Sequence, residues 1–408
     1  MAQVRIGRNE TWFFMMDIQH IFIVGSKGIP GAYGGYETFV DKLTEYHQHD
    51  TRFKYHVACK STENGEFEYH NARCFNVKVP NIGASSAILY DVRALFQCCD
   101  YIKKNSIPHP IVYCLACRIG PFAHMFREKI HKLGGRFFVN PDGHEWLRSK
   151  WSYPVRKYWR HSERMMVKQA DLLICDSKNI ESYIQETYSK YRPNTTFIAY
   201  GAEIRRSRLP DNDCRFVDWL AEKGLKPKEY YLVVGRFVPE NNYETMIREF
   251  MKSKTKKDFA LITNVNESFL NELNKKTGFD KDPRIKFVGT VYDQELLMKI
   301  REQAYGYFHG HEVGGTNPSL LESLASSDLS LLLDVGFNKE VAEDTAIYWN
   351  KTPGNLAQTI DRADLLSESE IRAIAKASTE RIAEAYSWNF IANEYAQIWN
   401  IAHNSSNK

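Results

Sequence analysis

Short apolar runs, separated by segments with helical periodicity, recur along most of the chain. The first covers residues 20–24, and a glycine-rich stretch follows it, then Phe39, Val40 and Leu43 on one helical face. A strand, a glycine-rich turn and an amphipathic helix form the opening unit of a doubly wound α/β domain. Further strand-like runs in this half cover residues 55–58, 111–113, 136–139, 172–175 and 196–199. Helical segments separate most of them, so a mainly parallel sheet is predicted.

A second series of strand-like runs lies in the other half of the chain. It covers residues 230–234, 260–263, 285–288, 304–308 and 329–333. Two α/β domains of similar size imply a cleft between them, and ligands bind at the carboxyl ends of such strands. The predicted organisation is a non-core extension (1–16), a first Rossmann-like domain (17–204), a linker (205–228), a second Rossmann-like domain (229–384) and a C-terminal helix (385–408).

Composition narrows the class of protein. Of the 408 residues 43% are hydrophobic, so a folded core is expected. No apolar run reaches the length of a transmembrane helix, and the patch at residues 12–16 is too short for a signal peptide. Cys114 and Cys117 have metal-like spacing, but no second pair follows, so we interpret them as core residues. The scattered cysteines favour a reducing, cytoplasmic compartment.

Positive charge is concentrated in the first half of the chain. Residues 1–200 hold 27 Lys and Arg against 19 Asp and Glu, and residues 118–168 hold 12 against 4. Basic side chains from Arg148 to Lys168 alternate there with Trp and Tyr, which suits an anionic membrane surface. The alternative is a solvated basic face with its aromatic side chains in the core. Nucleic acid is not an expected partner, because no recognised binding motif accompanies the charge.

One polar segment has the features of a helix N-terminus that binds an anion. Asn317 is a good N-cap, and Pro318 suits the first helical position. Gly314 and Gly315 let the backbone approach a ligand, so that free N–H groups and the helix dipole can face a phosphate. Glu322 would lie one turn inside the helix and accept hydrogen bonds from hydroxyls such as those of a ribose. The alternative is a capped loop with a surface glutamate.

A similar junction follows the run 230–234. Gly235 and Arg236 come directly after that predicted strand, and a guanidinium offers phosphate a planar fork of donors. Asn241 or Asn242 can cap the helix that follows. With the glycine-rich stretch near the N-terminus, these junctions suggest a diphosphate held between two domains.

Several motifs resemble a known family. The Gly235-Arg236 turn, the segment 314–322 and Tyr386-Ser-Trp388 before an amphipathic helix resemble family-four retaining glycosyltransferases of the GT-B fold. Further motifs are similar to the bacterial β-1,4-rhamnosyltransferase branch, which serves cell-wall polysaccharide and capsule assembly. They are Gly25-Ser-Lys-Gly-Ile-Pro with Tyr33-Gly-Gly-Tyr-Glu-Thr-Phe, Asn140-Pro-Asp-Gly-His-Glu-Trp with Arg148-Ser-Lys-Trp-Ser, Ala199-Tyr-Gly-Ala, Gly235-Arg-Phe-Val-Pro-Glu-Asn-Asn and Gly314-Gly-Thr-Asn-Pro-Ser-Leu-Leu-Glu.

The resemblance implies a GT-B enzyme that transfers L-rhamnose from dTDP-rhamnose to a lipid-linked saccharide, without a cofactor or metal. It implies a cytoplasmic protein, peripheral at the inner face of the membrane. The first domain would take the acceptor, the second the nucleotide sugar, and the C-terminal helix would pack back on the first. The implied catalytic residues are Asp142 and Arg236. The implied donor-binding residues are Gly28, Arg236, Asn241, Gly315, Thr316, Asn317 and Glu322. The implied sugar or acceptor candidates are Gly34, Gly35, Gly143, His144 and His311.

Two departures and several alternatives accompany this interpretation. The family usually has two glutamates with seven residues between them, but here Gly314 stands eight before Glu322, and Glu312 is the nearest acid. The usual phosphate-binding lysine is replaced near Asn241, which leaves the positive charge largely to Arg236. The alternatives for Asp142 and the two histidines are a turn residue and packed or exposed side chains. The alternative functions are transfer from a UDP-hexose, a sugar-nucleotide epimerase and a non-catalytic nucleotide-sugar-binding subunit.

Overall fold

The computed structural model describes residues 18–31, 34–80, 83, 85–148 and 150–406, so the predicted extension 1–16 lies outside the described residues. The first domain is built on an eight-stranded sheet, as far as these residues show, in the order β3-β4-β2-β1-β5-β6-β7-β8. All neighbouring strands are parallel except β3 and β4. The strands are β1 (Gln19–Val24), β2 (Phe53–Ser61), β3 (Glu66–Tyr69), β4 (Ala72–Lys78), β5 (Ile111–Leu115), β6 (Arg136–Asn140), β7 (Leu172–Cys175) and β8 (Thr195–Phe197).

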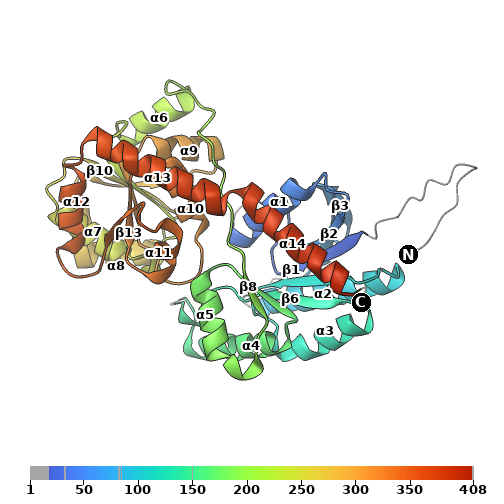
Figure 1. Cartoon of the computed structure of the whole chain (residues 1–408). Helices are drawn as coiled ribbons and strands as arrows, with labels where there is room; N and C mark the ends of the chain where they lie inside the picture. The colour runs from blue at the N-terminus through green and yellow to red at the C-terminus, as the bar shows by residue number, and fades with distance from the viewer. Residues whose placement is uncertain (1–17, 32–33, 81–82, 84, 149, 407–408) are drawn as a thin grey trace, which may run out of the picture.

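Helices cover both faces of this sheet (Figure 1). Alternate side chains of a strand point to opposite faces, so Ile21 and Ile23 lie in one apolar cluster while Phe22 and Val24 lie in the other. The sheet is therefore buried on both sides, as expected of a doubly wound domain. The helices of this domain are α1 (Gly35–His47), α2 (Ser85–Lys104), α3 (Gly120–Lys132), η1 (Glu145–Leu147), α4 (Tyr153–Gln169), α5 (Lys178–Thr187) and η2 (Ser189–Tyr191).

The second domain has a parallel sheet in the order β11-β10-β9-β12-β13-β14. Its strands are β9 (Tyr230–Val234), β10 (Asp258–Ile262), β11 (Ile285–Gly289), β12 (Gly306–His309), β13 (Ser330–Leu333) and β14 (Ile347–Trp349). Its helices are α6 (Cys214–Lys223), η3 (Pro239–Asn241), α7 (Tyr243–Lys252), α8 (Glu267–Thr277), η4 (Phe279–Lys281), α9 (Gln294–Glu302), α10 (Pro318–Ser326), α11 (Gly336–Ala342), α12 (Asn355–Ala363) and α13 (Glu368–Tyr386).

The segment between the two sheets contributes to the second domain. Helix α6 lies within the stretch that the sequence indicates as a linker, 205–228. Its Phe216, Trp219 and Leu220 are buried with Tyr230 of β9 in one apolar cluster. The stretch therefore begins as a connection and ends as part of the second domain.

The chain passes between the domains twice, and the two passages lie side by side. Ala202 donates its backbone N–H to the carbonyl of Tyr386 at 2.8 Å, just before α14 (Trp388–Ser406) begins. Helix α14 then crosses to the first domain, where it lies against α1 (Figure 1). There the indole nitrogen of Trp399 donates to the hydroxyl of Tyr55 at 2.8 Å. None of the described helices is long and apolar enough to span a bilayer.

Candidate functional site

The carboxyl ends of the two sheets meet at glycines. A Cβ atom added at Gly143, after β6, would lie 2.7 Å from the Cα of Gly314, after β12. A Cβ atom added at Gly315 would lie 2.0 Å from Oδ1 of Asp176, after β7. Thr316 donates its hydroxyl hydrogen to the backbone carbonyl of Asp176. The predicted residues Gly143, Gly315 and Thr316 are therefore brought together, because only glycine permits this approach of two backbones.

The predicted helix N-terminus is present beside this contact. Helix α10 begins at Pro318, and the side chain of Asn317 accepts a hydrogen bond from the backbone N–H of Ser319 at 2.9 Å. A hollow of about 40 Å³ opens next to it. Its lining residues are Val233, Val234, Gly235, Asn241, Tyr243, His309, Gly310, His311, Asn317 and Ser319. The positive end of the helix dipole thus adjoins a polar hollow, an arrangement that suits an anion.

Glu322 lies one turn into α10 and is held by a buried arginine. Nη2 of Arg301, in α9, lies 2.6 Å from a carboxylate oxygen of Glu322. The Arg301 side chain is only 4% exposed, whereas that of Glu322 is 37% exposed. The ion pair therefore fixes the direction of a carboxylate that solvent and ligands can still reach. Arg301 was missed by sequence reasoning, because a single arginine in an amphipathic helix gives no signal of its partner.

Arg236, Asn241 and His311 form a second group at the edge of the hollow. Asn241 donates its amide N–H to the carbonyl of Arg236 at 2.8 Å, and its amide oxygen lies 2.8 Å from Nδ1 of His311. Because that oxygen can only accept, Nδ1 of His311 carries the proton. Burial, and then His309 and Arg148, lower the pKa of His311 well below its ordinary value, so the imidazole is neutral. The Arg236 side chain itself is exposed.

Helix α7 differs in detail from the prediction. Asn242 occupies the N-cap position, but its side chain makes no capping hydrogen bond. It donates instead to the carbonyl of Gly310 at 2.8 Å and to the carboxylate of Glu312 at 2.6 Å. Lys351 pairs with the same carboxylate. Glu312, the acid nearest to the usual glutamate position, is therefore already neutralised by its own domain.

Two carboxylates of the first domain lie near the glycine loop, those of the half-buried Asp142 and the buried Asp176. Asp142 has a positive φ of 59°, and burial and then Glu145 raise its pKa. Burial and then Asp142 raise the pKa of Asp176 to about 7. Asp176 is 4% exposed, and its Oδ1 accepts no hydrogen bond from the described residues. Sequence reasoning missed Asp176, although its place directly after a predicted strand, like that of Asp142, was the available signal.

The burial of Arg148 shows that one prediction was wrong. The sequence places Arg148 in a basic surface segment, but it is buried, at 8% exposure, inside the cleft. Its Nε pairs with Glu145, and its Nη2 lies 3.9 Å from Oδ1 of Asp142. Arg148 follows the short helix η1 and precedes α4, which begins at Tyr153, so the periodicity of α4 does not indicate its burial.

The remaining candidates occupy the walls of the first domain. The ring of His144 packs at a tilt of 58° against that of Tyr183, with ring centroids 4.1 Å apart, and burial lowers the pKa of His144. Gly34 has a φ of 130° and forms the N-cap of α1, which begins at Gly35. Gly28 donates its N–H to the hydroxyl of Ser26 at 3.3 Å, so this amide does not point freely into the cleft.

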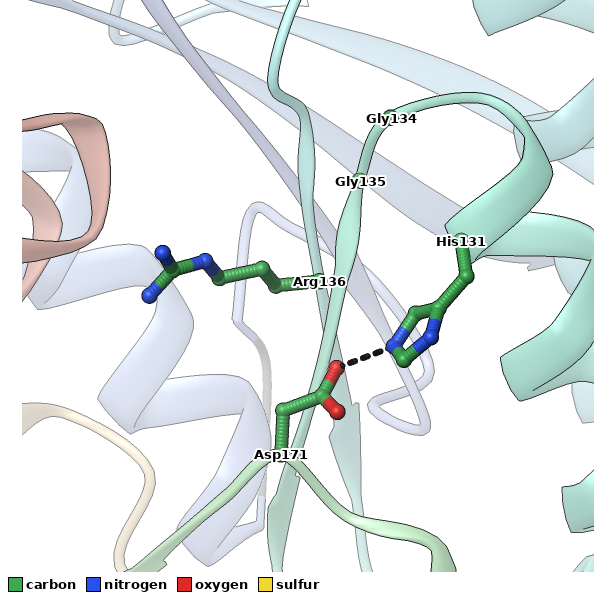
Figure 2. Close-up of a pocket in the computed structure, with 5 residues that line it drawn as sticks. All are labelled: His131, Gly134, Gly135, Arg136 and Asp171. Atoms are coloured by element: carbon green, nitrogen blue, oxygen red, sulfur yellow. Dashed lines mark hydrogen bonds and ion pairs between the residues drawn. The ribbon is translucent and has the colours of Figure 1, made fainter. Parts of the chain in front are cut away.

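A larger hollow lies elsewhere and does not contain these residues. It has a volume of about 420 Å³ and is lined by His131, Gly134, Gly135, Arg136 and Asp171. Figure 2 shows His131 bonded to Asp171, at 2.8 Å, with the Arg136 side chain pointing away from the pair. Arg136 begins β6 whereas Asp142 follows its end, so the hollow lies at the opposite edge of the sheet. Ligands of such sheets bind at the carboxyl edge, which favours the cleft.

Part of the sequence matches a known family model, and the fold of this chain is similar to those of solved proteins. Residues 18–203 match a family model described as a domain of unknown function, DUF1972. No curated protein matches the sequence. A sucrose-phosphate synthase from Thermosynechococcus elongatus superposes with a TM-score of 0.78 at 17% identity, over 95% of this chain and 100% of that one.

Two further solved structures agree with that likeness. The trehalose-6-phosphate protein from E. coli bound with UDP-2-fluoro glucose has a TM-score of 0.71 at 14% identity, over 93% of this chain and 99% of that one. A glycosyltransferase from Rickettsia africae has a TM-score of 0.69 at 12% identity, over 95% of this chain and 98% of that one. The predicted fold class is confirmed: the chain has the GT-B fold, with two parallel-sheet Rossmann-like domains.

Proposed function

We propose that this protein is a retaining glycosyltransferase that uses a nucleotide-sugar donor. The observation that carries the proposal is the meeting of the two strand ends across the cleft. The second domain brings the N-terminus of α10, with Gly315 and Thr316, to Gly143 and Asp176 in the first domain, and Asp142 directly precedes Gly143. One side is suited to a diphosphate and the other to a hydroxyl nucleophile, as group transfer between two substrates requires.

The chemistry of such a site is mainly electrostatic. When the glycosidic bond to the diphosphate breaks, negative charge grows on the leaving group. Arg236, the backbone amides of Gly315 and Thr316 and the dipole of α10 would stabilise that charge. Glu322, aimed by Arg301, would accept hydrogen bonds from the two ribose hydroxyls. The carboxylate of Asp142 would accept a hydrogen bond from the acceptor hydroxyl. Its raised pKa would favour transfer of the hydroxyl proton to this carboxylate.

The proposed donor is dTDP-rhamnose. The motifs of the sequence support this donor. The charges of the residues around Gly314, where the donor sugar would lie, support it as well. Gly314 stands where the family has a glutamate, His311 is neutral, and Glu312 is paired with Lys351. A subsite without an available carboxylate suits a deoxy sugar, which has fewer hydroxyls to bind. A UDP-hexose donor is the second candidate, because a GT-B neighbour is bound with UDP-2-fluoro glucose.

The proposed acceptor is a lipid-linked saccharide at the inner face of the cell membrane. Helix α4, in the acceptor-side domain, exposes a basic face with one exposed ring, formed by Tyr153, Lys157, Arg160, Arg164 and Lys168, while its Tyr158 and Trp159 are half-buried. Tyr153 is 68% exposed and lies under the ammonium group of Lys157 at 4.5 Å. Exposed cations beside an exposed ring suit an anionic interface, whereas buried rings would favour a solvated face.

A donor screen tests the proposal directly. Purified protein would be incubated with dTDP-rhamnose, UDP-glucose and UDP-galactose, with a lipid-linked saccharide as acceptor, and nucleoside diphosphate release would be followed. We expect release with dTDP-rhamnose and a product one deoxyhexose heavier than the acceptor. Release with a UDP-hexose alone would select the second candidate. Binding without release would identify a non-catalytic subunit, and conversion of the sugar nucleotide to an isomer would identify an epimerase.

A further inference from the structure

Arg148 is a buried cation of the first domain that points toward the second. Its Nη2 lies 3.9 Å from the position that a Cβ atom of Gly314 would take. Its charge also lowers the pKa of His311, as that of Arg236 does, so both guanidinium groups lie near this histidine. Arg236 belongs to the second domain and Arg148 to the first. The hollow beside the N-terminus of α10 is therefore approached by one arginine from each side of the cleft.

The Arg148 side chain retains unused hydrogen-bonding capacity. Its Nε pairs with Glu145, and Asp142 lies 3.9 Å from Nη2. Its Nη1 is buried and has no hydrogen-bond partner among the described residues. A buried donor without an acceptor is costly, and the cost is greater for a charged group. The geometry thus leaves a place for an acceptor group that a ligand would bring.

The second domain has an asparagine, Asn241, near the place where the resemblance of the sequence implies a phosphate-binding lysine. The amide of Asn241 is hydrogen-bonded to the carbonyl of Arg236 and to Nδ1 of His311. Arg236 alone would then face the two negative charges of a diphosphate. A second guanidinium from the opposite domain would balance them, and it would do so only where the two domains meet.

We propose that Arg148 binds the diphosphate of the donor across the cleft, as the second cation of the leaving-group site. This inference rests on the proposed function, because it names a further residue of that same site. Its Nη1 and Nη2 would donate to phosphate oxygens beside Gly314, while Glu145 holds Nε and fixes the plane of the guanidinium. Because the residue belongs to the acceptor-side domain, it would couple domain approach to stabilisation of the departing charge.

The test compares Arg148→Gln and Arg148→Lys with the wild type. Binding of thymidine diphosphate would be measured by calorimetry, and kcat and KM by sugar transfer. We expect Arg148→Gln to weaken thymidine diphosphate binding about tenfold or more and to lower kcat further, since charge-assisted contacts strengthen as charge develops. Arg148→Lys keeps the charge but not the fork, so it should recover part of the binding. Arg127→Gln, at the opposite edge of the same domain, is the matched control.

A double variant separates ligand binding from a purely structural role. If Arg148 only neutralised Glu145, then Glu145→Gln with Arg148→Gln would restore binding and melting temperature together. We expect the melting temperature to recover while thymidine diphosphate binding stays weak. Recovery of both, or wild-type kinetics in Arg148→Gln, overturns this inference alone. A wild-type protein that neither binds nucleoside diphosphates nor transfers sugar overturns the proposed function, and the inference with it.

Discussion

The carboxylate of Glu340, in the second domain, accepts a hydrogen bond from the side-chain amide of Asn179, in the first, at 2.6 Å. It also accepts from the backbone N–H groups of Lys178 at 2.8 Å and Asn179 at 3.1 Å, and from the hydroxyl of Ser177 at 2.9 Å. Helix α5 begins at Lys178, so a residue of one domain caps a helix of the other. The cap connects the two sides of the cleft directly.

Replacing Glu340 should therefore weaken the contact between the domains. We predict that Glu340→Ala lowers the free energy of unfolding by about 1–2 kcal/mol, the range for loss of a helix cap. It should also increase the radius of gyration measured by X-ray scattering, because the domains lose a polar link. Glu380→Ala, at an exposed position of α13, is the control. Equal scattering curves and melting temperatures for both variants would contradict this role.

The donor site gives a second prediction. Arg236→Ala and Glu322→Ala should each strongly lower donor turnover while leaving the fold intact, because both side chains reach solvent. Loss of a charge-assisted diphosphate contact should remove roughly 2–4 kcal/mol of transition-state stabilisation. Circular dichroism and steady-state kinetics check the two parts. Wild-type turnover in either folded variant would show that the residue does not serve the donor.

The sequence was sufficient for the architecture where strands are apolar and buried. Runs such as 20–24 and 230–234 became β1 and β9, because both faces of these strands are covered. Strands β3, β4 and β14 were not predicted; in β4 the polar, partly exposed Arg73 and Asn76 interrupt the buried residues. Residues 66–68 are exposed at an edge, so no apolar pattern marks β3, and β14 has only Trp349 buried among its three residues. Exposed or very short strands carry too little periodicity to detect.

The site could be predicted only where chemistry is local. Asn317 caps α10 because the residues that determine a cap are neighbours in sequence. Burial and ion pairing depend on residues in other elements for Arg148, Asp176 and Arg301. No spacing in the sequence connects these residues with their partners. A buried arginine and a surface arginine look alike until the fold places Glu145 and Gly314 around one of them.

The buried Asp176 predicts a pH dependence of stability. Its pKa is raised by burial from 3.8 to about 7 in the folded protein, so the folded state holds a proton that the unfolded state has lost between these values. Stability should fall as pH rises from about 4 to about 7 on this account. We predict that Asp176→Asn raises the free energy of unfolding by up to roughly 4 kcal/mol at pH 8 and leaves it nearly unchanged near pH 4. Thermal melts across this range would detect it, and an equal effect at both ends would contradict it.

Metal removal should leave transfer unaffected. We propose that Arg236, the amides of α10 and the adjoining glycine loop neutralise the diphosphate, which would make a divalent cation unnecessary. Sugar transfer should therefore proceed at the same rate in excess EDTA as in its absence. Loss of activity in EDTA that returns when Mg²⁺ is added would show that a metal cation helps to neutralise the diphosphate.

The last prediction concerns the basic face of α4. An enzyme that glycosylates a lipid-linked sugar must bind where the lipid diphosphate leaves the bilayer. We predict that the protein sediments with anionic vesicles at low salt and is released as salt screens the charges. Replacing Arg156, Lys157 and Arg160 by Glu should abolish sedimentation while donor hydrolysis in solution continues.

Two features of the structure shape the control for this experiment. Arg156 also donates to the carbonyl of Trp146 at 2.8 Å, so the melting temperature of the triple variant must be measured beside its sedimentation. Replacing the exposed Lys275, Lys276 and Lys281 by Glu changes the net charge equally on the second domain. If binding depends on position, only the α4 variant should lose it. Equal loss of sedimentation in both variants would show that binding depends only on net charge. Continued sedimentation of the α4 variant would show that α4 is a solvated face and does not bind the membrane.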